Sequence, residues 1–398
     1  MGEARVVLSF ARDEKYCRHS EGDLIRLKDG GILFIYTRFK GAKAGDAAPA
    51  DLAKRVSYDN GETWSEAEEI VPAAMFGTQN IMSVSMLRML DGDIGLFFVA
   101  KQIPGFKNRP IHMRSSDEGK TFRYVCECGP EEYWIRMGMN NARVIRLSNG
   151  RIIYPLSIHP GEVKAKGIEP ITEDTAGNFT YSDELGYYVW NRSPHLEGKR
   201  ASPQTIGTFM YSDDDGYTWH KSPDTVFPPF TNTEKGIQEG EVIELQPGVL
   251  KCFWRTDKMH QYEAVSFDNG IHWTAAQPSC FTSNCSPITI ERNPYNGKIY
   301  AIWNPIPLYN GRERGFVDSG RTPLAIAETS EDVSSFGVIH NIEDDPVGAY
   351  AYTATLFLSE TELLLAYCAG LPEDRHGLSR MSVAKITIDP TENEVKND

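Results

Sequence analysis

The sequence predicts an all-β fold, a six-bladed β-propeller with four-stranded antiparallel blades. Three observations lead to it: a repeated turn motif, pairs of short strand patterns between its copies, and the composition. The 398 residues include 34 Gly, 23 Pro, 18 Tyr, 18 Phe and 7 Trp, which is typical of many strands joined by tight turns. Sustained helical periodicity of apolar residues is almost lacking, so helix is expected to be minor.

The repeated motif reads S-x-D-x-G-x-[T/H]-[W/F], and we call it the Asp box. Its aspartate is suited to accept local backbone N–H bonds, its glycine allows a positive φ, and its aromatic residue fills the space between neighbouring sheets. Each box is therefore expected to close a hairpin. A calcium loop is disfavoured because the spaced oxygen ligands and the terminal glutamate of an EF-hand are missing. Four copies and a degenerate fifth begin at Ser57, Ser115, Ser212, Ser266 and Ser330.

The spacing of the boxes predicts the architecture. Their starts lie 58, 97, 54 and 64 residues apart, which fits one blade per box plus a surface insertion at 159–178 in the widest interval. Six strand pairs turned by short loops predict six blades in one domain spanning residues 1–398. The expected pairs are 23–27 with 31–37, 84–89 with 94–100, 142–147 with 151–155, 241–245 with 249–254, 288–292 with 298–303, and 354–358 with 362–368.

Composition and charge exclude several function classes. The chain has 41 Lys+Arg against 55 Asp+Glu, a net charge of −14, which argues against a nucleic-acid partner. No apolar stretch approaches the roughly 20 residues of a membrane span. No signal-peptide pattern is visible, so a cytoplasmic location is expected by default, and a secreted or periplasmic one if a leader was removed. Seven cysteines without paired C-x-x-C spacing predict free thiols and no structural metal site.

The boxes and blades resemble the sialidase (neuraminidase) superfamily over about residues 15–385. The most specific match is the run 238–245, Gln-Glu-Gly-Glu-Val-Ile-Glu-Leu, followed by Trp-Arg-Thr at 254–256 and then the fourth box. The resemblance implies that Glu239 is the carboxylate partner of the nucleophile. It also implies that Arg255 is one of three arginines that bind a substrate carboxylate, a task that suits planar guanidinium groups because they form bidentate bonds.

The same resemblance implies the other main site residues. Arg321 and Arg18 are the remaining arginines, although Arg18 stands in Cys-Arg-His-Ser where the family has aromatic-Arg-Ile-Pro. Tyr352 is the implied nucleophile, with Tyr350 two residues away on the same face of the strand. A neutral phenol suits attack on an anomeric carbon that bears a carboxylate, and Glu239 would take its proton.

Three further residues complete the candidate site. The general acid/base is expected on the loop after the first strand pair, where Asp46 is favoured over Asp51. Arg143, beside the third strand pair, is a candidate for contact with the sugar, although a role in the turn is equally consistent. Arginines at strand starts also often pair with nearby carboxylates for structural reasons. The joint placement of the implied residues at matching blade positions favours the functional interpretation.

The resemblance implies an exo-acting, retaining glycoside hydrolase. Its substrate would be a glycoconjugate with an anionic terminal sugar, sialic acid or a similar 2-keto acid sugar, and it would need no metal or organic cofactor. Two alternatives stay open: a glycosidase or lyase that acts on another anionic sugar, such as a deoxyoctulosonate or a uronate, and a non-catalytic carbohydrate-binding propeller. The sequence predicts neither the linkage nor the oligomeric state.

Overall fold

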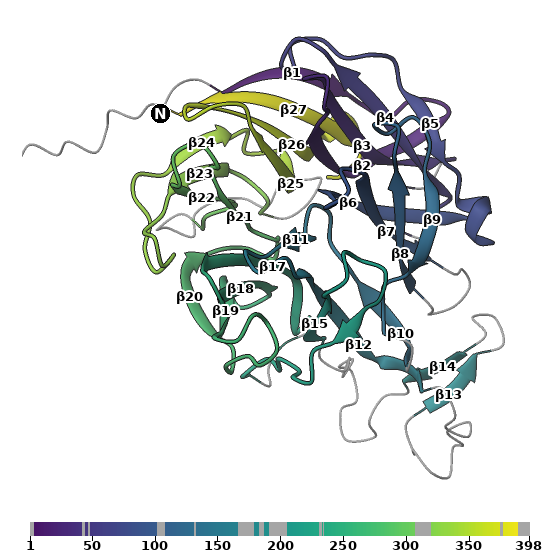
Figure 1. Ribbon diagram of the computed structural model, residues 1–398, viewed down its shortest axis with the longest axis vertical. Helices are drawn as coiled ribbons and strands as arrows, with labels where there is room; N and C mark the ends of the chain where they lie inside the picture. Colours follow the sequence, from purple (N-terminus) through teal and green to yellow (C-terminus); the bar gives the residue numbers. More distant parts are fainter. Residues whose placement is uncertain are drawn as a thin grey trace, which may run out of the picture.

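The computed structural model describes residues 4–388 except 42–43, 47, 102–107, 131–132, 166–178, 183–186, 191–204, 231–232, 234, 307–319 and 375–376. Sheets are arranged around a centre in a propeller-like ring (Figure 1). Within the described residues the only helices are two short 3₁₀ segments, η1 (Ala73–Phe76) and η2 (Pro372–Asp374). No helix in this part of the chain is long and apolar enough to cross a membrane.

Residues 16–127 form the largest sheet, with eight strands. Strands β4 and β6 are joined by a single parallel pair, Ala50 with Asn80, and β5 pairs with β4. All other neighbours in this sheet are antiparallel. Its strands are β2 (Tyr16–Arg26), β3 (Ile32–Lys40), β4 (Ala50–Ser57), β5 (Glu68–Val71), β6 (Asn80–Arg88), β7 (Ile94–Lys101), β8 (Asn108–Ser115) and β9 (Arg123–Glu127).

The next sheet has five strands, because two separate strands pair with one edge of the same neighbouring strand. Strands β10 (Tyr133–Gly138) and β11 (Ile145–Arg146) both pair with β12 (Ile152–Ala165), followed by β15 (Ile206–Ser212) and β16 (His220–Lys221). A separate hairpin of β13 (Phe179–Ser182) and β14 (Tyr187–Trp190) extends from the ring (Figure 1). Within the insertion expected at about 159–178, residues 159–165 belong to β12. Residues 166–178 lie outside the described residues.

The remaining sheets have four antiparallel strands each. The last of them is closed by the N-terminal strand β1 (Ala4–Phe10), which pairs with β27. Its other strands are β25 (Ala349–Phe357), β26 (Glu362–Gly370) and β27 (Arg380–Thr387). The other two sheets comprise β17 (Ile237–Gln246), β18 (Val249–Thr256), β19 (His260–Ser266) and β20 (Gln277–Thr282), and β21 (Thr289–Arg292), β22 (Ile299–Trp303), β23 (Leu324–Glu328) and β24 (His340–Glu343).

All six expected strand pairs are present as antiparallel neighbours. The prediction of six separate four-stranded blades is nevertheless wrong as a count of sheets. The parallel pair between Ala50 and Asn80 merges two groups of strands into one sheet, and β10 adds a fifth strand beside β11. The fold that the structure shows is all-β, with a propeller-like arrangement of mostly four-stranded antiparallel sheets.

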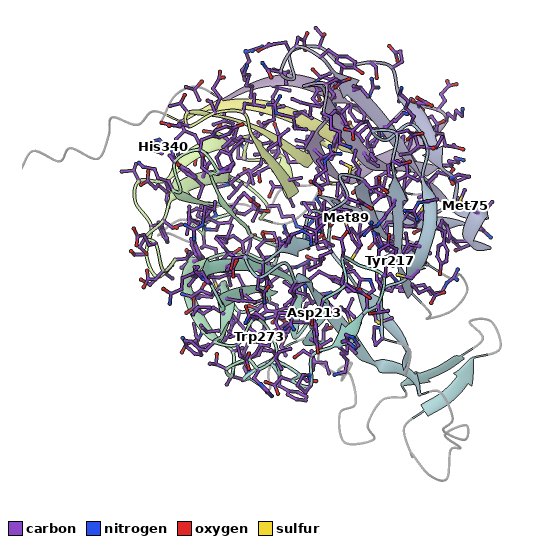
Figure 2. The ribbon with its side chains drawn as sticks, viewed as in Figure 1. Met75, Met89, Asp213, Tyr217, Trp273 and His340 are labelled. Carbon is purple, nitrogen blue, oxygen red and sulfur yellow. The ribbon has the colours of Figure 1, made fainter. Side chains whose placement is uncertain are left out.

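The Asp boxes form the turns that their sequence predicts. In the first box, Gly61 N–H donates to Ser57 Oγ at 2.9 Å, and the backbone and hydroxyl of Thr63 donate to the two oxygens of Asp59 at 2.8 and 2.5 Å. These bonds lower the pKa of Asp59 to about 2. Trp273 of the fourth box, labelled in Figure 2, stacks on Phe209 of the preceding sheet with ring centroids 3.8 Å apart. The boxes therefore have a structural role, because they form turns and pack neighbouring sheets against each other.

Four strands carry a β-bulge at a corresponding place. These strands are β2, β6, β17 and β25. Strand β2 contacts both β6 and β25, and β17 contacts β12 and β21. In each, the register with the next strand shifts at one residue with a positive φ. A bulge re-aims its side chain away from the regular alternation of the strand. The bulge residues are Glu21 (49°), Ser83 (66°), Glu239 (47°) and Tyr352 (59°).

Candidate active site

A cavity of about 450 Å³ lies where these bulges meet, and all four bulge residues line it. The crowding around the bulges explains their glycines. A Cβ at Gly22 would come within 2.6 Å of Phe34, and one at Gly240 within 2.7 Å of Pro155. The backbone distortion thus places polar side chains from strands far apart in the sequence around one space. Asp46, Arg255 and Arg321 also line this cavity.

Tyr352, Glu239 and Arg255 form one hydrogen-bonded group. The phenol of Tyr352 donates to Glu239 Oε1 at 3.0 Å, and Arg255 Nη1 donates to Glu239 Oε2 at 2.6 Å and to the phenol oxygen at 3.2 Å. Arg255 reaches them because it lies opposite Gln238, the neighbour of Glu239, in the β17–β18 ladder. Glu239 is itself held by its backbone N–H, which donates to Ser157 Oγ at 2.8 Å. The group pairs a nucleophile with a base that is oriented by a third residue.

Arg321 lies against the other side of the tyrosine. Its guanidinium carbon is 5.3 Å from the centroid of the Tyr352 ring, and its Nη2 donates to the carbonyl of Cys285 at 3.4 Å. Arg255 and Arg321 therefore bring two guanidinium groups to the same phenol in a cavity. Such a pair is suited to bind a carboxylate of a ligand beside the tyrosine oxygen.

The surroundings keep the tyrosine protonated at neutral pH. Burial raises the pKa of Tyr352, the negative charge of Glu239 raises it further, and Arg255 and Arg321 oppose the rise. Because the phenol already donates to Glu239, the proton has an acceptor in place when the oxygen attacks an electrophile. General-base assistance of this kind requires heavy-atom distances of about 2.6–3.2 Å, and the pair meets that condition.

Asp46 lines the cavity from the loop between β3 and β4, and its side chain is 56% exposed. Arg18 Nη1 binds Asp46 Oδ1 at 2.6 Å, and Arg18 Nη2 binds Glu21 Oε1 at 3.0 Å. The backbone of the loop is fixed as well, since Asn80 Nδ2 and Lys101 Nζ donate to the carbonyl of Asp46 at 3.3 and 3.1 Å. The structure thus places a carboxylate at the edge of the cavity on an anchored loop.

Arg18 is fully buried and does not line the cavity. Its guanidinium is occupied by Asp46, Glu21, Ser20 and the carbonyl of Ala44. Arg18 lies behind the cavity wall and orients two carboxylates that line the cavity, those of Glu21 and Asp46. The three-arginine arrangement implied by the resemblance is therefore not assembled around this cavity, because Arg18 carries no surface there.

Three further candidates also lie away from the cavity lining. Asp51 is buried, where it accepts the N–H of Ala73 at 2.7 Å and pairs with Lys40. Arg143 is buried, with its Nη1 2.5 Å from Glu241 Oε2. Tyr350 packs in the apolar core beside Tyr367. The expectation that Tyr350 shares the face of Tyr352 is wrong because the bulge at Tyr352 breaks the alternation.

Several lining residues were not predicted, and Glu21 carries the clearest signal in hindsight. Glu21-Gly22-Asp23 and Glu239-Gly240-Glu241 share the pattern Glu-Gly-acidic before a predicted strand pair, and both glutamates occupy a bulge. Periodicity treats such residues as ordinary strand positions. No comparable pattern marks other polar lining residues such as Ser83, Lys101 and Asn108.

Comparisons of sequence connect this geometry with known proteins. Sialidase-3 of Bos taurus is 24% identical over 246 residues, which are 58% of this chain and 50% of that protein. An anhydrosialidase of Macrobdella decora is 27% identical over 171 residues, 40% of this chain and 21% of that protein. The chain thus matches half or less of the length of these relatives.

Comparisons of structure give the same fold. A protein of unknown function from Dyadobacter fermentans has a TM-score of 0.67 at 17% identity, covering 98% of this chain and all of that one. A Hadza microbial sialidase has a TM-score of 0.66 at 13% identity, covering 96% of this chain and 68% of that one. The predicted resemblance to the sialidase superfamily is confirmed. A family model described as a BNR repeat-like domain matches residues 50–365, and the chain belongs to that family.

Proposed function

We propose that this protein is an exo-acting, retaining glycoside hydrolase that removes a terminal anionic sugar from a glycoconjugate. The observation that carries the proposal is the hydrogen-bonded group of Tyr352, Glu239 and Arg255, with Arg321 against the tyrosine ring. Similarity to sialidases supports it at the family level. Sialidases are the tyrosine-nucleophile exception among retaining glycosidases, and a 2-keto acid sugar such as sialic acid is the first substrate to test.

In the proposed reaction, Arg255 and Arg321 bind the carboxylate of the sugar and place its anomeric carbon at the Tyr352 oxygen. The phenol oxygen attacks, Glu239 takes the phenolic proton, and Asp46 donates a proton to the leaving oxygen as the glycosidic bond breaks. Water then attacks the anomeric carbon while Asp46 takes a proton from the water, the bond to the Tyr352 oxygen breaks, and Glu239 returns its proton to that oxygen to restore the phenol. The net charge of −14 repels an anion at long range, so affinity must come from the local arginines.

A second candidate is a glycosidase for another anionic sugar, such as a deoxyoctulosonate or a uronate. The observation that favours it is the burial of Arg18 behind Glu21 and Asp46, which leaves two arginines in the cavity lining.

We also propose that the eight-stranded sheet is two blades, since β2–β5 and β6–β9 each carry one box and join at a single parallel pair. The ring would then have six blades.

The deciding experiment is hydrolysis of fluorogenic glycosides of sialic acid, deoxyoctulosonate and glucuronate by the wild type, Tyr352→Phe and Tyr350→Phe. We expect turnover of at least one glycoside, a loss of about 10³-fold or more in Tyr352→Phe, and near wild-type rates in Tyr350→Phe, whose hydroxyl lies outside the cavity lining. Binding without turnover would point to a carbohydrate-binding propeller. An unsaturated sugar among the products would point to a lyase.

A further inference from the structure

We propose that Glu21 is a specificity-determining residue, which accepts hydrogen bonds from hydroxyl groups of the sugar whose carboxylate binds Arg255 and Arg321. The inference rests on the proposed function in its use of an anionic sugar. It starts from the backbone: Glu21 occupies in β2 the bulge that Glu239 occupies in β17. Both side chains line the same cavity.

The surroundings of Glu21 hold its carboxylate in one orientation before a ligand binds. Oε1 accepts from Arg18 Nη2 at 3.0 Å, and Oε2 accepts from Ser83 Oγ at 2.7 Å. The backbone N–H of Glu21 donates to Cys368 Sγ at 3.2 Å. A side chain fixed by a buried arginine and a neighbouring bulge residue loses little conformational freedom when a ligand arrives, and such preorganisation favours binding.

The carboxylate keeps hydrogen-bonding capacity toward the cavity. An ionised carboxylate has about four acceptor positions, and donors among the described residues occupy one on each oxygen of Glu21. Removing such a group from water is costly unless its remaining positions are satisfied. The hydroxyls of a polyhydroxylated ligand offer matching donors for these positions.

Charge then sets the direction in which a ligand lies. Glu21 comes from β2, which packs beside β6 and β25, whereas Arg255 comes from β18 on another sheet. A ligand carboxylate is repelled by Glu21 and attracted by the two arginines, while hydroxyl donors favour Glu21. Glu239 has a different task, because it is paired with the phenol of Tyr352 and with Arg255. The two glutamates therefore have different roles: Glu239 accepts the proton of the nucleophile, and Glu21 accepts hydrogen bonds from the sugar hydroxyls.

The test uses two small probes that differ only in hydroxyl groups, cyclohex-1-ene-1-carboxylate and shikimate, its trihydroxy derivative. Dissociation constants are measured by NMR titration for the wild type, Glu21→Ala, Glu21→Gln and the control Glu263→Gln. Glu263 lies in β19 beside Lys251, away from the cavity lining. Hydrogen bonds to a charged group contribute enough for about a tenfold preference or more.

We expect the wild type and Glu263→Gln to prefer shikimate by about tenfold or more, and Glu21→Ala to lose that preference while binding the hydroxyl-free probe at least as well. Glu21→Gln, which keeps the shape of the side chain, should show a reduced preference and serves if Glu21→Ala fails to fold. No preference in the wild type, or one that survives in both Glu21 variants, overturns the proposal. Because these titrations need no turnover, failure to cleave any glycoside overturns the proposed function separately.

Discussion

A buried group of carboxyls beside Arg143 predicts that the folded state loses stability as the pH rises. Asp23 and Glu241 are both buried, and Arg143 provides one guanidinium, bound to Glu241 at 2.5 Å. Burial raises the pKa of Asp23 from 3.8 to about 7 and that of Glu241 from 4.5 to about 8, and the nearby charge of Glu291 adds to both increases.

The sign follows from proton binding. Between about pH 4 and pH 8 the folded state holds protons that the unfolded chain has released, so the free energy of unfolding falls as the pH rises through this window. A pKa difference of about three pH units, at about 1.4 kcal/mol per unit, gives roughly 4 kcal/mol for each carboxyl. The contribution of these two carboxyls to stability should therefore be greatest below about pH 4 and should level off above about pH 8.

The assay is urea unfolding followed by tryptophan fluorescence at pH 5.5, 7.0 and 8.5 and constant ionic strength. Glu241→Gln, which resembles the protonated side chain, should cost little at pH 5.5 and should flatten the decline toward pH 8.5. A wild-type free energy of unfolding that stays constant or increases between pH 5.5 and 8.5 would refute the reasoning. An unchanged slope in Glu241→Gln would refute the assignment to that carboxyl.

Two other predictions concern the acid and the boxes. Asp46→Asn should lower kcat by about 10²-fold or more for a glycoside with a poor leaving group. The loss should be much smaller for a methylumbelliferyl glycoside, because a good leaving group needs little protonation. Asp51 lies outside the cavity lining, so the control Asp51→Asn should show no such dependence on the leaving group. Gly216→Ala should lower the free energy of unfolding by about 2 kcal/mol more than Gly297→Ala in urea titrations. Both glycines have a positive φ, but only a Cβ at Gly216 would approach another residue, His112, at 2.8 Å. Equal losses in the two variants would contradict the packing argument.

The sequence predicts this fold well where local chemistry determines the structure. Box turns depend on Ser, Asp and Gly within a few residues, and hairpins depend on short polar turns between apolar runs, so both are confirmed. The site is predicted in part, since the resemblance leads to Tyr352 and Glu239, whose contact unites strands β25 and β17. Such contacts are set by the ring and not by local sequence.

The failures share a physical cause, which is register. A bulge at Tyr352 turns Tyr350 into the core, and a bulge at Glu21 turns an ordinary strand position toward the cavity. A single parallel pair between Ala50 and Asn80 changes the number of sheets. Each event involves one or two residues, so patterns averaged over a strand do not reveal it.

The pairing of β1 with β27 also bears on how the chain folds as the ribosome makes it. Residues 4–10 emerge long before their partner strand, which comprises residues 380–387. At about 5–20 residues per second, the first strand waits roughly 20–75 s for its place. Until then the nascent chain exposes unpaired strand edges, which invite pairing with other chains. The pairing that closes the ring between β1 and β27 is therefore formed long after β1 is made, and the edge of β1 must stay protected until β27 is available.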